Sequence, residues 1–124
     1  MTPGESREQA LQVLYAADAL GAAPDLEGVA AKAAMLAEGV WGHREELDAV
    51  IASRARGWRV ERMPAVDRTL LRIGAFELLH TDTPVGVIVS EAVELAKRYS
   101  TGRSGSFING VLGALARDTP RPGR

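Results

Sequence analysis

The segment from Val66 to Leu79 constrains the fold most, because it is apolar around most of a helical circumference. Its apolar members are Val66, Leu70, Leu71, Ile73, Gly74, Ala75, Phe76, Leu78 and Leu79. Pro64 suits the first turn of a helix, so the spacing predicts a helix from about 64 to 80. A helix that is apolar on nearly every side must be covered by other elements. We therefore expect this helix at the centre of the fold.

Apolar residues also follow helical spacing on the N-terminal side of this segment. Ser6 and Gln9 fit a capping box, which predicts a first helix over about 7–20. Asp25 is a suitable N-cap for a second helix, and a third is expected over about 43–56. The N-terminal half is therefore predicted to be helical.

Two further helices are predicted after the central one, over 85–99 and from a cap at Ser104 or Ser106. The β-branched start of the first could also form a strand, but no other segment offers a partner of similar quality. The predicted fold is all-α, a compact single-domain bundle of about six to seven helices. We expect the domain to span 1–118 and the tail 119–124 to be disordered.

The net charge of −1 conceals two halves of opposite sign. Residues 1–48 carry three basic against nine acidic side chains, whereas residues 49–124 carry twelve against seven. The whole positive excess lies in residues 95–124, where six basic side chains face Asp118 alone. A near-neutral total therefore does not exclude nucleic acid, and any such contact is expected near the C-terminus.

The chain offers few residues of the kind an active site needs. It contains no cysteine, which excludes disulfides, thiolate metal sites and thiol nucleophiles. Its only histidines, His43 and His80, lie in different segments without His-x-x-x-His or Glu-x-x-His spacing. Glu91 and Glu94 fit a solvated helix face better than a catalytic pair. We therefore predict no enzymatic activity, no cofactor and no metal site.

The sequence carries no export or membrane signal. No apolar run approaches the roughly 20 residues of a membrane span. The N-terminus lacks the basic and then apolar pattern of a signal peptide. A cytoplasmic protein is therefore expected.

A polar loop over 100–106 lies between two aromatic residues, Tyr99 and Phe107. Its hydroxyls and Arg103 precede a helix, whose first N–H groups attract anions such as phosphate. Single-stranded RNA is commonly held by aromatic stacking together with phosphate contacts to basic side chains. The same spacing also suits two core anchors of adjacent helices, so the stacking and core interpretations both remain open.

A second group of residues interleaves arginine with Trp58, Glu61 and Asp67, and its net charge is close to zero. Mixed charge around tryptophan is typical of a protein interface. A solvated helix–turn–helix with local ion pairs explains the same residues equally well. The arginines are Arg54, Arg56, Arg59, Arg62, Arg68 and Arg72.

Several sequence segments resemble the NusB family. They are VDRTLLRIGAFELL over 66–79, SEAVELAK over 90–97 and FINGVL over 107–112. A weaker match, QALQVLY over 9–15, lies where that family begins its first helix. The resemblance covers most of the chain and is most specific in its C-terminal half. Within the FINGVL motif, Gly110 is expected to permit close helix packing.

The resemblance implies an all-helical domain that acts in transcription antitermination. Such a factor binds boxA RNA of ribosomal RNA operon transcripts together with NusE, a protein of the small ribosomal subunit, in a complex with other Nus factors and RNA polymerase. It implies no cofactor and no catalysis. A homodimer is one alternative. An RNA methyltransferase module is another, although 124 residues leave no room for a methyltransferase domain.

The resemblance also assigns site residues by position. Contact with NusE is implied for Tyr15, Glu61 and Asp67, and acidic side chains suit a basic ribosomal protein. Contact with RNA is implied for Arg7, Lys97, Arg98, Tyr99, Arg103, Ser104 and Phe107.

The chain departs from the family at two places. Many members begin with an arginine-rich stretch that contributes to RNA binding, whereas this chain has only Arg7 there, beside Glu5 and Glu8. The position of Arg103 is commonly acidic in the family. We hypothesise that Arg103 partly compensates for the missing N-terminal arginines.

Overall fold

The computed structural model describes residues 2–121 of the chain. Within that range the secondary structure is entirely helical, which confirms the predicted fold class. No helix in this range is long and apolar enough to cross a membrane. The elements are α1 (Pro3–Leu20), α2 (Ala31–Gly42), α3 (Arg44–Ala52), the short 3-10 helix η1 (Val60–Arg62), α4 (Ala65–His80), α5 (Val85–Tyr99) and α6 (Ser104–Asp118).

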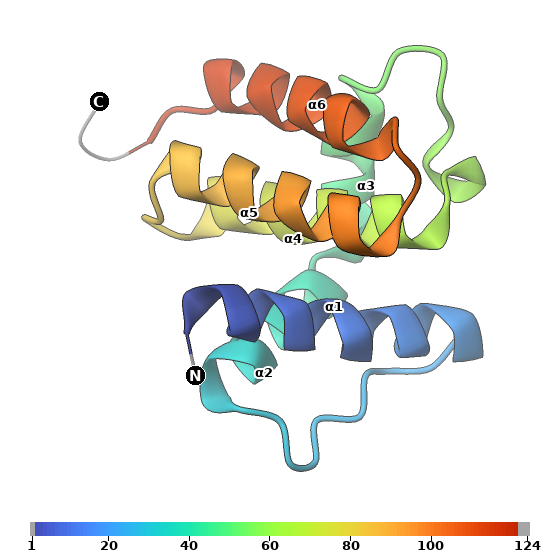
Figure 1. Ribbon diagram of the computed structural model, residues 1–124, viewed down its shortest axis with the longest axis vertical. Helices are drawn as coiled ribbons and strands as arrows, with labels where there is room; N and C mark the ends of the chain where they lie inside the picture. The colour runs from blue at the N-terminus through green and yellow to red at the C-terminus, as the bar shows by residue number, and fades with distance from the viewer. Residues whose placement is uncertain (1, 122–124) are drawn as a thin grey trace.

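Helix α4 is the central element, because it contacts each of the other five α-helices. In Figure 1, α1 and α2 form one group and α4, α5 and α6 form another, and α3 rises from the end of α2 behind the second group. Ten of the 16 residues of α4 are buried, which explains why its sequence is apolar on almost every side. The prediction that this segment lies at the centre is confirmed.

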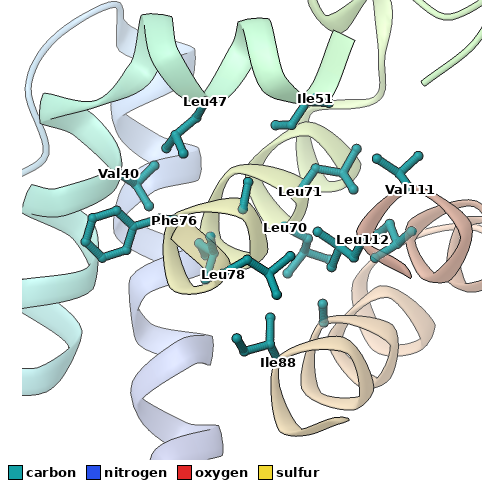
Figure 2. Packing of buried hydrophobic residues seen from close by; sticks show 14 of the residues in the cluster. Val40, Leu47, Ile51, Leu70, Leu71, Phe76, Leu78, Ile88, Val111 and Leu112 are labelled. Carbon is teal, nitrogen blue, oxygen red and sulfur yellow. The ribbon is translucent and has the colours of Figure 1, made fainter. Parts of the chain in front are cut away.

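The core forms where the other helices meet α4 (Figure 2). Each neighbouring helix contributes aliphatic side chains that are almost fully removed from solvent. The labelled residues are Leu70, Leu71, Phe76 and Leu78 from α4, Val40 from α2, Leu47 and Ile51 from α3, Ile88 from α5, and Val111 and Leu112 from α6. Burial of these side chains supplies most of the force that holds the bundle together.

Helix α1 begins earlier than the sequence predicted. The Thr2 hydroxyl oxygen accepts a hydrogen bond from the Glu5 N–H at 3.1 Å, and the Glu5 carboxylate accepts one from the Thr2 N–H at 3.0 Å. Pro3 occupies the first helical position, where its missing N–H is not needed. The predicted cap, Ser6, is instead buried inside the helix, so that prediction was wrong.

Helix α2 begins later than predicted, at Ala31. Asp25 does not cap it, because its carboxylate accepts a hydrogen bond from the nearby Glu27 N–H at 3.1 Å. Gly28 then adopts a left-handed conformation with φ of 73°, which interrupts the helical path. The side chain of Gln9 accepts a hydrogen bond from the Ala30 N–H at 3.1 Å and so ties the approach to α2 against α1.

The chain after α6 returns to the C-terminal end of α4. The Arg121 guanidinium donates hydrogen bonds to the carbonyl oxygens of Leu78 at 2.7 Å and Glu77 at 3.2 Å, and also to that of Thr83. A cation is favourable here because helix carbonyls point outward at a C-terminus. Arg121 thus has a defined place within the tail expected to be disordered, and residues 122–124 lie outside the described residues.

Candidate functional site

Tyr15 and Tyr99 line the same apolar hollow, which we call the tyrosine hollow. It has a volume of about 280 Å³ and is lined by Leu11, Gln12, Tyr15, Val66 and Tyr99. The two tyrosines are 46% and 43% exposed, so the hollow is open to a partner. The family resemblance implied a protein partner for Tyr15 and RNA for Tyr99, and the structure brings these two residues together.

Glu8 on α1 contacts two side chains at the C-terminal end of α5. The Tyr99 hydroxyl donates a hydrogen bond to the Glu8 carboxylate, and Arg98 Nη1 lies 3.2 Å from the same oxygen. This hydrogen bond to Glu8 raises the pKa of the Tyr99 phenol. Glu8 therefore holds the Tyr99 side chain and offsets the charge of Arg98.

Lys97 and Arg103 are two exposed basic side chains of this region. Within residues 2–121 neither forms an ion pair. Lys97 lies in the last turn of α5, and Arg103 directly precedes α6. Their charges are therefore free to meet an external anion.

Asp67 and Ser104 are buried and contact each other, so neither side chain faces a partner in this structure. Asp67 is 4% exposed and Ser104 is 3% exposed. The Asp67 carboxylate accepts hydrogen bonds from the Ser104 hydroxyl at 2.8 Å and the Ser100 hydroxyl at 2.6 Å. The structure corrects the interpretation of both residues: Asp67, in the first turn of α4, fastens the loop that connects α5 to α6.

Replacing Asp67 with Ala is expected to destabilise this loop and lower the free energy of unfolding by about 1–3 kcal/mol, because the hydroxyls of Ser100 and Ser104 lose their acceptor. Urea denaturation followed by circular dichroism measures the loss. Glu61→Ala is the control, since its side chain is 72% exposed and its removal should change stability by less than about 0.5 kcal/mol. Equal, small losses in both variants would contradict the fastening role.

Arg7 is buried rather than directed toward solvent. Its side chain is 3% exposed, and its Nε and Nη2 donate to the two carboxylate oxygens of Glu77, each at 2.7 Å. These hydrogen bonds to Glu77 raise the pKa of Arg7 further. The prediction that Arg7 contacts RNA is corrected, because its guanidinium pairs with a carboxylate inside the bundle.

Phe107 packs against the core but is not fully removed from solvent. Its ring lies 5.6 Å from that of Trp58, measured between centroids, and Trp58 is 54% exposed. Trp58 was assigned from sequence to the arginine-rich group, and its proximity to Phe107 arises only from the tertiary fold.

The arginine-rich group separates into internal pairs and exposed residues. Arg72 forms a two-pronged pair with Asp48 at 2.7 and 2.8 Å, while Arg68 pairs with Asp18. Burial alone would raise the pKa of Asp18, but hydrogen bonds and charge from Arg68 and Arg72 outweigh it and lower that pKa. Local ion pairing therefore accounts for Arg68 and Arg72.

Glu61 lies at the edge of a second hollow, which we call the arginine hollow. This hollow has a volume of about 610 Å³, and its lining includes Trp58, Arg59 and Glu61 together with the Arg68 and Arg72 pairs. Arg59 and Glu61 are both exposed and only 4.0 Å apart. The arginine hollow thus presents both charge signs beside an exposed indole.

The two histidines, far apart in sequence, are neighbours in the structure. The ring centroids of His43 and His80 are 4.3 Å apart, and Glu46 contacts His80 at 2.6 Å. Spacing along the chain gave no sign of this proximity, which arises because α3 packs on α4.

These features define an all-helical bundle with exposed aromatic and basic groups where α1, α5 and α6 meet. The chain belongs to the NusB family, whose sequence pattern matches residues 4–117. The transcription antitermination protein NusB of Symbiobacterium thermophilum is 45% identical over 138 residues, covering 94% of this chain and 90% of that protein. The resemblance found in the sequence is confirmed.

Solved structures give the same result. T. maritima NusB superposes with a TM-score of 0.86 at 28% identity, covering 96% of this chain and 93% of that one. A crystal structure of the antitermination factors NusB and NusE with double-stranded RNA contains a chain that matches with a TM-score of 0.80 at 28% identity, covering 93% and 96%.

Proposed function

We propose that this protein is a transcription antitermination factor that binds boxA RNA of ribosomal RNA operon transcripts together with NusE. Membership of the NusB family supports this function, as does the match to a chain solved with NusE and RNA. The observation that carries the proposal is the convergence of Tyr15, Tyr99, Lys97 and Arg103 on one end of the bundle. This function needs no catalytic group and no cofactor. We place the protein that performs it in the cytoplasm.

RNA binding is assigned to the exposed end of α5 and the start of α6. Lys97 and Arg103 supply positive charge for phosphates, because neither is neutralised within the described chain. Tyr99 and Phe107 supply ring faces on which unpaired bases stack. Trp58, 5.6 Å from Phe107, extends the same aromatic surface.

NusE binding is assigned to the hollows beside this surface. Tyr15 offers an exposed ring in the tyrosine hollow, and Glu61 offers an exposed carboxylate at the arginine hollow. A carboxylate suits a basic ribosomal protein. Other Nus factors and RNA polymerase would be reached through NusE and the RNA. The alternative to NusE on this surface is a second copy of this chain, which would make a homodimer. Light scattering of the protein alone at several concentrations shows whether a homodimer forms.

The test of this function is a titration of labelled boxA RNA with and without NusE, followed by fluorescence anisotropy. NusE is expected to raise the RNA affinity, because the two ligands bind adjacent surfaces and NusE adds contacts and positive charge. An affinity that does not change on adding NusE would contradict joint binding.

Two variants on the same surface should move RNA binding in opposite directions. Lys97→Ala removes a phosphate contact, so the slope of log affinity against log salt should become shallower by about 0.7. Glu8→Gln frees Arg98 for a new phosphate contact, so the slope should become steeper by a similar amount. The same titration repeated at four or five salt concentrations measures both.

Glu94→Gln is the matched control for Glu8→Gln. It changes the net charge equally and lies on α5, yet no ion pair within the described chain involves Glu94. Its effect on the salt slope should be smaller. If the two variants behave alike, total charge rather than release of Arg98 governs the affinity.

A further inference from the structure

The strongest unassigned feature is a cluster of His43, Glu46 and His80, on the surface where α3 meets the end of α4. One ligand atom from each residue lies within 4.8 Å of the others. All three residues are exposed, so an ion can reach them directly from solvent. Two imidazoles and one carboxylate are a donor set that binds Zn²⁺ in proteins.

Helix geometry fixes two of the three donors. His43 directly precedes α3 and Glu46 lies three residues later, so both side chains lie on one side of the first turn. They also line one hollow of about 310 Å³, formed by residues 41–46. His80, the last residue of α4, supplies the third donor from the neighbouring helix.

A contact with a backbone carbonyl restrains the His43 ring. Its Nδ1 lies 2.7 Å from the carbonyl oxygen of Gly39, which can only accept a hydrogen bond. Nδ1 is therefore the protonated nitrogen of the neutral ring, and Nε2 keeps its lone pair. Histidine ligands of metals commonly make this second hydrogen bond to a carbonyl.

Aromatic packing holds the two imidazoles side by side. The His43 and His80 centroids are 4.3 Å apart, and both rings contact Phe76 at 5.6 and 5.3 Å. Phe76 is 6% exposed and belongs to the core, so both imidazole rings pack against a buried side chain. The ligand rings thus rest on a fixed surface.

The three donor atoms, which lie within 4.8 Å of one another, must rearrange to admit an ion. His80 Nε2 and Glu46 Oε1 are 2.6 Å apart, whereas two ligands of a tetrahedral Zn²⁺ are separated by about 3.3 Å. Glu46 is half exposed, so its carboxylate can shift by this amount without disturbing the core. To bind the ion, His80 Nε2 must give up the proton of its hydrogen bond with Glu46, which moves to Nδ1 of a neutral ring or leaves to solvent from a charged one.

We propose that His43, Glu46 and His80 form a binding site for a divalent transition metal, with Zn²⁺ as the preferred ion. The protein supplies three ligands, and water completes a tetrahedral shell. Hard ions such as Mg²⁺ prefer all-oxygen sites and are excluded by the two imidazoles. The bound ion would join the N-terminus of α3 to the C-terminus of α4.

Isothermal titration of the metal-free, untagged protein with Zn²⁺ tests the site. One ion per chain is expected, with no binding of Mg²⁺ under the same conditions. Co²⁺ should give the visible absorption of a tetrahedral centre. Absence of Zn²⁺ binding up to about millimolar concentration would overturn the proposal.

Single-residue variants decide whether the ion binds at these residues. His43→Gln, Glu46→Gln and His80→Gln should each weaken Zn²⁺ binding at least tenfold, since loss of even an outer partner costs roughly 10–100-fold. Glu45→Gln removes a neighbouring exposed carboxylate outside the cluster and should leave the affinity unchanged. Zn²⁺ should also raise the melting temperature of the parent protein but not of the three variants. Binding that persists in all three would place the ion elsewhere and refute the assignment.

Discussion

Replacing Glu77 with Ala is expected to lower the free energy of unfolding by about 3–5 kcal/mol, because it leaves the Arg7 charge buried without a partner. The side chains of Arg7 and Glu77 are each 3% exposed and share two hydrogen bonds of 2.7 Å. Arg7 Nη1 is also buried, and it has no hydrogen-bond partner among residues 2–121. Glu77 is therefore the main group that compensates this guanidinium.

Two controls separate the cost of an unpaired charge from the value of the pair. The double variant Arg7→Met/Glu77→Leu removes both charges and should recover most of the loss. Arg98→Ala breaks the exposed pair with Glu8 and should cost less than about 1 kcal/mol. Urea denaturation followed by circular dichroism measures all three. A loss below about 1 kcal/mol for Glu77→Ala would show that solvent reaches Arg7.

Replacing Gly74 with Ala should destabilise the protein by about 1–3 kcal/mol, because a Cβ at this position would lie 2.6 Å from Leu112 Cδ1 and 2.8 Å from Cδ2. Leu112 is fully buried where α6 crosses α4, so it cannot move away freely. This steric cost exceeds the gain of up to about 1 kcal/mol from replacing glycine within a helix. Thermal and urea unfolding measure the difference.

Gly110→Ala is the matched control on α6 and should have the opposite sign. Nothing lies within 4 Å of a Cβ built at Gly110, so the helix-propensity gain of about 0.5–1 kcal/mol is not offset. The expectation that Gly110 permits close packing was wrong, since the side of α6 at Gly110 is open, whereas α4 meets α6 closely at Gly74. If both variants lost stability equally, packing at Gly74 would not be the cause.

The sequence was sufficient to predict the parts of the fold that depend on local periodicity. The apolar circumference of residues 66–79 predicted a central helix, because a helix that is buried on every side needs apolar residues all around its axis. Helix starts were harder to predict, because Thr2 with Glu5 and Ser6 with Gln9 are two successive candidates for a capping box. Pro3 at the first helical position favours the earlier box.

Site residues were harder to predict where their environment depends on distant segments. Arg7 lies 70 residues from Glu77 in the sequence, and nothing near Arg7 indicates that its charge is paired inside the bundle. Asp67 and Ser104 are 37 residues apart, so nothing near either residue indicated their mutual hydrogen bond, and the family resemblance implied partner contacts instead. By contrast, the position of Tyr99 at the end of a helix followed from its local pattern, and its exposure suits the proposed RNA contact.

The position of α4 has a consequence for cooperativity. Because this helix contacts both the α1–α2 group and the α5–α6 group, neither group can lose its packing without exposing one side of α4. The chain should therefore melt in a single two-state transition. A defect at Glu77, which faces α1, and one at Gly74, which faces α6, would then shift the same unfolding curve.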